Sequence, residues 1–261
     1  MESVRIAVTG LGLVTPLGNT VNETWERLLA GVSGIGPITH FDAKALGLAC
    51  QIAGEVKNFD ASEIIPKKEL KKCDRFIHLG WAASDEALKM AGVLNADNKV
   101  DDALATRFGC ILGSGIGGLA EIERTKEVVD ERGYSRVSPY FIPAILINML
   151  GGQVSMAYNL KGANVAPVSA CATGTHAIGE AAKMIQRGEA DIMLAGGAEA
   201  AITPLSVGGF AAARALSTQY NETPEQASRP FDTARDGFVM GEGAGVLVLE
   251  NWDHAVKRGA N

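Results

Sequence analysis

Between Asn164 and Ala195 the sequence reads NVAPVSACATGTHAIGEAAKMIQRGEADIMLA, and this segment alone predicts a fold class. Its pattern predicts a strand at Asn164–Ser169, a helix at Thr173–Arg187 and a second strand at Asp191–Ala195. Apolar residues of the helix recur at i, i+3, i+4 and i+7 and form one face: Ile178, Ala181, Ala182 and Ile185. A strand, helix and strand of this length predict a βαβ unit with parallel strands and a right-handed crossover.

The flanking sequence extends the same alternation. Further strands are predicted at Arg5–Thr9, which ends at the turn Gly10-Leu11-Gly12, at Phe108–Leu112 and at Ala244–Glu250. Helices are predicted at Asn22–Ala30, Asp74–Ala91, Leu119–Glu131, the second part of Tyr140–Tyr158, and Trp252–Arg258. The fold class is therefore α/β, with helices on both faces of a sheet.

Composition excludes several classes of partner. The chain has 261 residues and a formal net charge of −6, which argues against a general nucleic-acid or membrane surface. No apolar run is long enough to span a bilayer, and the N-terminus shows no signal or transit peptide. The four cysteines show neither CxxC nor metal-ligand spacing, which favours a reducing, cytoplasmic setting without a bound metal.

Cys171 is the sharpest chemical feature, because it stands between a predicted strand end and a predicted helix start. The free N–H groups and positive dipole end of a helix favour the thiolate, which is the nucleophilic form of cysteine. Small neighbours leave room for a substrate carbonyl: Ala170, Ala172 and Gly174. A buried, inert cysteine is the alternative, and it is the preferred interpretation for the other three cysteines: Cys50, Cys73 and Cys110.

None of the four histidines forms a recognisable pair with Cys171. His176 lies five residues further on, roughly 140° around the helix, so it is interpreted as a packing or surface residue. His40, His78 and His254 belong to no recognisable constellation and are interpreted as structural.

The segment Gly113-Ser114-Gly115-Ile116-Gly117-Gly118 fits GxGxxG after a strand and before a helix. A dinucleotide-binding site is one interpretation, but it also requires an acidic residue at the end of the next strand. Asp130 and Glu131 instead fall at the end of the predicted helix. The other interpretation is that these glycines let the backbone pass close to a ligand or to a neighbouring helix.

A basic cluster precedes the helix predicted at Asp74–Ala91. It consists of Lys67, Lys68, Lys71 and Lys72, and Arg75 extends it. A charge run of this kind is usually a solvated helix face, but on an acidic chain it is also a candidate site for an anionic partner.

Several segments, in this order, resemble the β-ketoacyl synthases, the condensing enzymes of the thiolase-like fold, and in particular their type 2 elongating branch. They are Val8-Thr9-Gly10-Leu11-Gly12 with Thr15-Pro16-Leu17-Gly18, then Ser169-Ala170-Cys171-Ala172-Thr173-Gly174, Ala195-Gly196-Gly197-Ala198-Glu199-Ala200, Gly209-Phe210 with Ala213-Arg214-Ala215-Leu216-Ser217, and Arg229-Pro230-Phe231-Asp232 with Arg235-Asp236-Gly237-Phe238-Val239 and Gly241-Glu242-Gly243-Ala244. The resemblance covers essentially the whole chain.

This resemblance implies an acyltransferase of fatty acid biosynthesis that needs no cofactor. An acyl group would pass from acyl carrier protein to Cys171, whose own backbone N–H would be one oxyanion-hole donor. The acyl group would then condense with malonyl-carrier protein, with loss of carbon dioxide, to give a 3-oxoacyl-carrier protein. Residues matching the family's acyl pocket are Ile116, Leu119 and Phe210, with Phe141 reaching the pocket of the other subunit of a homodimer. Residues matching its carrier-docking surface are Lys67, Lys68, Lys71, Lys72 and Arg214.

The resemblance is to the N-terminal half of these enzymes. It implies that residues 1–250 form that half and that residues 251–261 begin the connection to a second half. In the family the second half supplies two histidines, a lysine and a loop that completes the oxyanion hole. Residues 1–261 by themselves are therefore expected to expose an apolar face and to lack condensation activity. The alternative function is a catalytically inert fragment that keeps only dimer and carrier-protein surfaces.

Overall fold

The structure is a computed structural model that describes residues 4–260. Its main feature is a five-stranded mixed sheet in the order β1-β7-β6-β4-β5. These strands are β1 (Ile6–Val14), β7 (Gly243–Asn251), β6 (Ile192–Glu199), β4 (Phe108–Gly113) and β5 (Asn164–Val165). β7 is antiparallel to both β1 and β6, whereas β4 is parallel to both β6 and β5. A small second sheet pairs β2 (Gly36–Pro37) with β3 (Ile52–Ala53).

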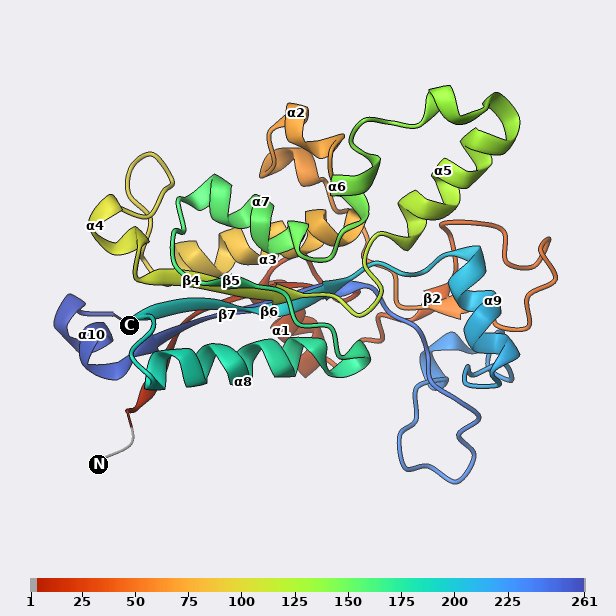
Figure 1. The fold of residues 1–261 in the computed structure, drawn as a ribbon. Coiled ribbons are helices and arrows are strands. Elements are labelled where there is room, and N and C mark those ends of the chain that lie inside the picture. The colour runs from red at the N-terminus through yellow and green to blue at the C-terminus, as the bar shows by residue number, and fades with distance from the viewer. Residues whose placement is uncertain (1–3, 261) are drawn as a thin grey trace.

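Helices cover both faces of the main sheet, as the sequence predicts (Figure 1). α3 (Arg75–Met90) and α7 (Met149–Tyr158) pack on one face, and α8 (Thr173–Gln186) packs on the other. The remaining α-helices are α1 (Val21–Leu29), α2 (Lys67–Leu70), α4 (Asp102–Ala105), α5 (Leu119–Arg132), α6 (Phe141–Ile145), α9 (Pro204–Ala212) and α10 (Trp252–Arg258). Residues 4–260 also contain four short 3-10 helices: η1 (Ala61–Glu63), η2 (Tyr134–Arg136), η3 (Ala170–Ala172) and η4 (Pro224–Gln226).

The predicted apolar face of α8 packs against the sheet. Ala181 and Ile185 are buried, and Ile178 and Ala182 lie against the same cluster. The strands before and after α8 are both parallel to β4, so the predicted βαβ unit is present with β4 between its two strands.

The first of those strands is shorter than predicted. The pattern Asn164–Ser169 predicts six residues, but β5 pairs with β4 only over Asn164 and Val165. Pro167 follows closely, and proline has no N–H to donate to a sheet ladder. The chain therefore leaves the sheet early and forms the loop that carries Cys171.

β1 is longer than predicted. The prediction that it ends at Thr9 before a glycine turn is wrong, because Gly10 and Gly12 continue the strand to Val14. A Cβ atom at Gly12 would lie 1.8 Å from the carbonyl oxygen of Ala83, and one at Gly10 would lie 2.1 Å from that of Ala87. These glycines are required because α3 crosses the strand at this close distance.

Candidate active site

Cys171 lies in the loop between β5 and α8, at the centre of the one-turn helix η3. The residue before it, Ala170, has φ of 50°, a left-handed conformation that is uncommon for a residue with a Cβ atom. Thr173 braces this turn, because its buried hydroxyl donates to the Ala170 carbonyl at 2.7 Å and accepts from the Ser169 N–H at 2.9 Å. The strained turn presents the Cys171 side chain at the surface rather than in the core.

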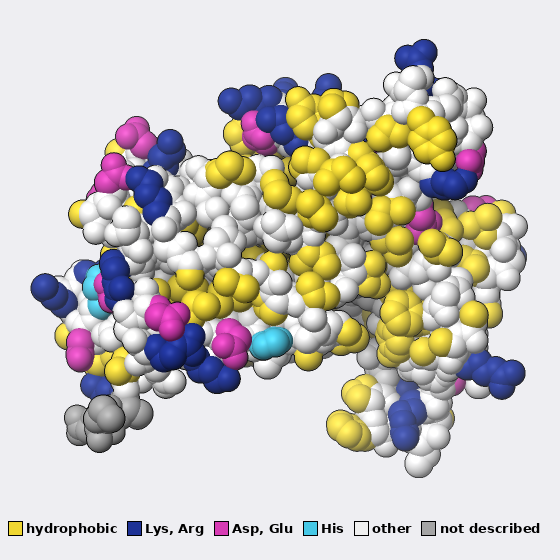
Figure 2. Space-filling model, viewed as in Figure 1, with side chains coloured by type: hydrophobic (Ala, Val, Ile, Leu, Met, Phe, Trp, Pro, Cys, Tyr) yellow, Lys and Arg dark blue, Asp and Glu magenta, His cyan; other side chains and the backbone are white. Residues whose placement is uncertain are grey.

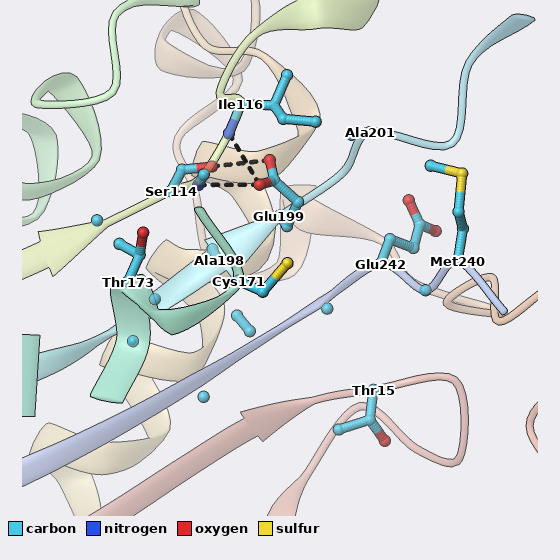
Figure 3. A pocket seen from close by; sticks show the side chains of 18 of the residues that line it. Thr15, Ser114, Ile116, Cys171, Thr173, Ala198, Glu199, Ala201, Met240 and Glu242 are labelled. Carbon is cyan, nitrogen blue, oxygen red and sulfur yellow. Dashed lines mark hydrogen bonds between the residues drawn. The ribbon is translucent and has the colours of Figure 1, made fainter. Parts of the chain in front are cut away.

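Cys171 faces a cavity of about 680 Å³ at the end of the sheet where β1, β4 and β6 finish and β7 starts (Figure 3). Ends of β1, β4, β6 and β7 contribute to its wall, together with the start of α8. Most of the lining is apolar and includes Ile116, Phe210 and Phe238. The two phenylalanine rings pack edge to face, with 5.4 Å between their centroids. A concave, largely apolar site beside a thiol is suited to an acyl chain.

The other three cysteines are separated from this site by burial. Cys50, Cys73 and Cys110 are buried, whereas Cys171 is exposed. Burial raises the pKa of the Cys50 thiol, that of Cys73 to about 11 and that of Cys110 to about 12. Among the four cysteines of the described residues, Cys171 alone combines solvent access with a position just before the start of α8.

The backbone around Cys171 offers a donor for a substrate oxygen. Within residues 4–260 the Cys171 N–H donates to no acceptor, whereas the next N–H, that of Ala172, donates to the Ser169 carbonyl at 3.1 Å. A free N–H beside the sulfur can hydrogen-bond the oxyanion that develops when a thiolate attacks a thioester carbonyl.

The glycine-rich loop at Gly113–Gly118 does not offer a phosphate site. Its N–H groups point at the carboxylate of Glu199, which accepts from Gly115 and Ile116, each at 2.9 Å (Figure 3), and from Gly117 at 3.2 Å. A dinucleotide needs such N–H groups for its pyrophosphate. Because they already bind a carboxylate of the protein, the loop forms part of the cavity wall and not a nucleotide cradle.

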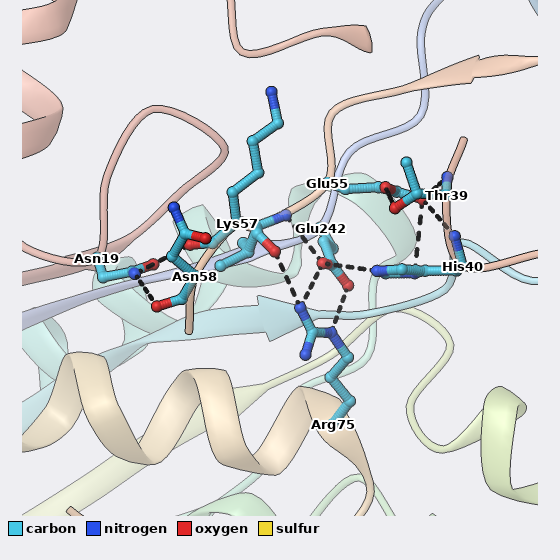
Figure 4. Close-up of polar contacts among 9 residues, drawn as sticks. Asn19, Thr39, His40, Glu55, Lys57, Asn58, Arg75 and Glu242 are labelled. Carbon is cyan, nitrogen blue, oxygen red and sulfur yellow. Dashed lines mark hydrogen bonds and ion pairs between the residues drawn. The ribbon is translucent and has the colours of Figure 1, made fainter. Parts of the chain in front are cut away.

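Glu242 is a cavity residue that the sequence did not single out for a role. Its side chain is buried and accepts from Arg75 Nε at 2.8 Å and from the Val56 N–H at 2.9 Å (Figure 4). His40 Nε2 lies 3.7 Å from the same carboxylate. Arg75, which the sequence assigned to the exposed basic cluster, therefore points inward instead, because a buried carboxylate requires a cationic partner.

Glu55 is a second buried carboxylate, and it lies beside His40. Glu55 accepts from the Thr39 hydroxyl at 2.6 Å and from the His40 N–H at 3.1 Å. Burial by itself would raise the pKa of Glu55, but the hydrogen bonds from Thr39 and His40 outweigh burial and lower it. Glu55, His40, Glu242 and Arg75 thus form one network of hydrogen bonds and ion pairs, and Glu242 joins this network to the cavity lining.

The histidines are placed away from the thiol, as the sequence predicts. No histidine of the described chain lines the cavity. His176 is exposed and its Nδ1 lies 3.1 Å from the Ser169 hydroxyl, while His78 is half-buried against the Leu70 carbonyl at 3.1 Å. His254 pairs with the buried carboxylate of Glu250. A Cys-His pair is therefore not formed within residues 4–260.

The predicted acyl-pocket residues divide into two pairs. Ile116 and Phe210 line the cavity that contains Cys171. Leu119 and Phe141 are half-buried and stand outside its lining. For Phe141 the sequence predicts a role in the pocket of another subunit, so its absence from this cavity leaves that prediction untested.

The predicted docking residues lie on two separate elements. Lys67, Lys68 and Lys71 are exposed at α2, where Figure 2 shows a group of basic side chains. Lys72 is half-buried, pairs with Glu69 at 3.0 Å and stands over the Tyr140 ring. Arg214 is exposed just after α9, which stands apart from α2 in Figure 1.

The described residues contain no cluster of three side chains that could hold a metal ion, and no helix among them is long and apolar enough to cross a membrane.

Comparison with known proteins identifies the family to which this chain belongs. Residues 3–255 match the family model of the beta-ketoacyl synthase N-terminal domain. The chain is 48% identical over 260 residues to 3-oxoacyl-[acyl-carrier-protein] synthase 2 of Coxiella burnetii and 47% identical to that of Synechocystis. Each match covers 100% of this chain and 61% of the relative, so the chain spans about three fifths of the length of these relatives.

Two solved structures have the same fold as this chain. A beta-ketoacyl synthase from Burkholderia phymatum superimposes with a TM-score of 0.86 at 33% identity, over 99% of this chain and 62% of that one. A ketosynthase from a type II PKS, in complex with its acyl-carrier protein and bound to a hexaketide, superimposes with a TM-score of 0.85 at 30% identity, over 100% and 61%. The mixed sheet with helices on both faces is thus the N-terminal half of the thiolase-like condensing-enzyme fold, and the chain belongs to the beta-ketoacyl synthase family.

Proposed function

We propose that this chain carries the nucleophile of a 3-oxoacyl-[acyl-carrier-protein] synthase and that Cys171 accepts the acyl group. The observation that carries the proposal is the position of Cys171, exposed on a strained turn before α8 and facing an apolar cavity of about 680 Å³. The relatives at 48% and 47% identity bear this name, which supports the assignment of the reaction.

The first step is transfer of an acyl group between two thiols. The Cys171 thiolate attacks the carbonyl carbon of an acyl-carrier thioester, and the oxyanion accepts a hydrogen bond from the Cys171 N–H. The tetrahedral intermediate collapses, the carbon–sulfur bond to the carrier breaks, and the carrier leaves as a thiolate that takes up a proton. The acyl chain lies along Ile116 and Phe210.

The second step is condensation with malonyl-carrier protein. Loss of carbon dioxide leaves a carbanion that attacks the Cys171 thioester, which frees the cysteine and gives a 3-oxoacyl-carrier protein two carbons longer. No histidine lines the cavity among the described residues. Residues 1–261 by themselves are therefore expected to accept an acyl group without decarboxylating malonyl-carrier protein at an enzymatic rate.

Acyl carrier protein is the proposed partner. The exposed lysines of α2 and the exposed Arg214 offer positive charge on a chain whose net charge is −6. The related PKS ketosynthase was solved with its own acyl-carrier protein, which supports a carrier-docking role. Charges at the rim of such a surface act mainly on association rate and salt response.

A homodimer is also proposed. Figure 2 shows exposed apolar side chains gathered over α6 and the segments beside it, and those of α6 and its two flanking residues are Tyr140, Ile142 and Leu146. β5 is an edge strand whose two residues are exposed, and an uncovered edge can pair with a second chain. Phe141 begins α6, so a partner on this surface would bring it toward another subunit.

Product analysis tests the proposal and separates it from the inert-fragment alternative. The chain is incubated with acyl-carrier protein, and the released carrier thiol is measured over one turnover. Release that depends on Cys171 supports the acyltransferase. Carrier binding without thiol release would support the inert fragment.

A further inference from the structure

The carboxylate of Glu199 is bound by a ring of hydrogen-bond donors beside the acyl cavity. Its Oε2 accepts from the N–H groups of Gly115 and Ile116, each at 2.9 Å. Its Oε1 accepts from the Ser114 hydroxyl at 2.8 Å and from the Gly117 N–H at 3.2 Å. Successive backbone N–H groups that converge in this way form a nest for an anion, and here the anion belongs to the protein.

Strand register explains why this residue reaches this loop. β4 and β6 are parallel neighbours, and Gly113 lies opposite Gly197 at the end of their pairing. Glu199 stands two residues beyond Gly197, on the same side of the sheet because side chains alternate along a strand. It therefore faces the loop that begins at Ser114, as Figure 3 shows.

The loop held by Glu199 connects the acyl cavity with the nucleophile turn. Ile116 supplies part of the cavity wall, and the residue is 39% exposed, so packing alone fixes it weakly. A Cβ atom at Gly115 would lie 3.1 Å from the carbonyl oxygen of Ala170, the strained residue before Cys171. One at Gly118 would lie 2.5 Å from Ile145 Cα, so the loop is also in close contact with α6.

We infer that Glu199 is a positioning residue that sets acyl-chain specificity by holding Ile116 in the cavity wall. The inference rests on the proposed function of Cys171 as acyl acceptor. Glu199 does not take part in the chemistry, because both its oxygens are occupied by four donors of the loop. When the carboxylate is lost, two or more of these donors lose their acceptor and the wall at Ile116 relaxes.

The test uses Glu199→Gln, which keeps size but replaces one oxygen by an NH₂ donor that faces other donors. Alkylation of Cys171 is measured with N-alkyl iodoacetamides whose alkyl chains run from methyl to dodecyl. These reagents read the cavity whether or not the protein transfers acyl groups. The ratio of dodecyl to methyl rate is expected to fall about tenfold, the effect of losing charge-assisted hydrogen bonds, with the methyl rate within about twofold of the parent. A parallel reaction with acyl-carrier protein tests the proposed function separately.

Two further variants separate positioning from general damage. Glu180→Gln, on the solvent side of α8 where Glu180 pairs with Lys183, should leave the rate ratio unchanged. In an Ile116→Ala background, Glu199→Gln should no longer change the ratio, because the side chain that it positions is absent. Hydrogen exchange at Gly115–Gly117 should be faster in Glu199→Gln than in the parent, which checks the hydrogen bonds even in a destabilised variant. An unchanged ratio, an equal loss for both reagents, or an undiminished effect in Ile116→Ala would overturn the inference.

Discussion

Arg75 and Glu242 are joined by two short hydrogen bonds, from Nε at 2.8 Å and from a terminal guanidinium nitrogen at 2.7 Å. Arg75 is the first residue of α3, and Glu242 directly precedes β7 and lines the cavity of Cys171. The same guanidinium donates to the Val56 carbonyl at 3.2 Å. This bidentate pair ties one wall of the cavity to the first turn of the helix that packs at the centre of the core.

Arg75→Met should destabilise the protein strongly. The Glu242 side chain is 1% exposed, so removal of its cation leaves a buried charge without its partner, at a cost of about 3 kcal/mol. Arg187→Met is the matched control, because both side chains of the Arg187–Glu189 pair are about half exposed and a surface pair of this kind contributes much less. Urea unfolding measures both. Equal losses for the two variants would show that the Arg75–Glu242 pair is no stronger than a surface pair.

Glu250 should make the stability of the folded protein depend on pH in the acid range. Burial by itself would raise the pKa of Glu250, but hydrogen bonds from Arg258 and His254 outweigh burial and lower it. A carboxyl group with a lowered pKa in the folded state contributes stability above its ordinary pKa of about 4.3, and that contribution is lost as the pH falls below this value. Glu250→Gln should therefore be less stable than the parent at pH 7, with a smaller difference at pH 4. A difference that stays constant between the two pH values would contradict this account.

Limited alkylation should label Cys171 first. Cys50, Cys73 and Cys110 are buried, and burial raises the pKa of each of their thiols, whereas Cys171 is exposed beside the start of α8. Peptide mapping after a short reaction with iodoacetamide near pH 7.5 measures the order. Cys171→Ala should remain folded and lose the fast phase, since the change is small and at the surface. Labelling of any other cysteine at the same rate in folded protein would refute the assignment.

Charge reversal at α2 should weaken carrier binding. Lys67, Lys68 and Lys71 are exposed, so their replacement by Glu should lower the association rate for an acidic carrier about tenfold at low salt and flatten its salt dependence. A variant with the same change of net charge at distant positions serves as control: Lys126→Glu, Lys183→Glu and Lys257→Glu. Stopped-flow binding at several salt concentrations compares the two. If both variants bind equally, α2 is a solvated face and not the docking surface.

The sequence predicted the order of the main strands and helices because their apolar patterns are set by burial on a sheet. Trp252–Arg258 was predicted with the correct bounds, since Asn251 caps its start and Gly259, at φ of 70°, ends it. The end of β1 was predicted wrongly because Gly10 and Gly12 are typical of a turn. Their requirement comes from α3, more than sixty residues away in sequence, and no local pattern reports that contact.

The site could be predicted from the sequence only where its residues are close together along the chain. Cys171 could be found because a strand end, small residues and a helix start are neighbours in sequence. The roles of Glu199 and Glu242 depend on partners far along the chain, Ser114–Gly117 and Arg75, which only the folded sheet brings close. Arg75 was assigned to the exposed basic cluster because a charge run does not show which of its members points inward.

Intact mass after incubation with acyl-carrier protein tests the central claim, that Cys171 is the acyl acceptor, most directly. We expect a mass increase of one acyl group, which digestion maps to the peptide that contains Cys171 and which hydroxylamine removes, as it does from a thioester. Cys171→Ala should show no increase while its unfolding curve matches that of the folded parent. An acyl group found on Cys50, Cys73 or Cys110, or an equal mass increase in Cys171→Ala, would contradict the account.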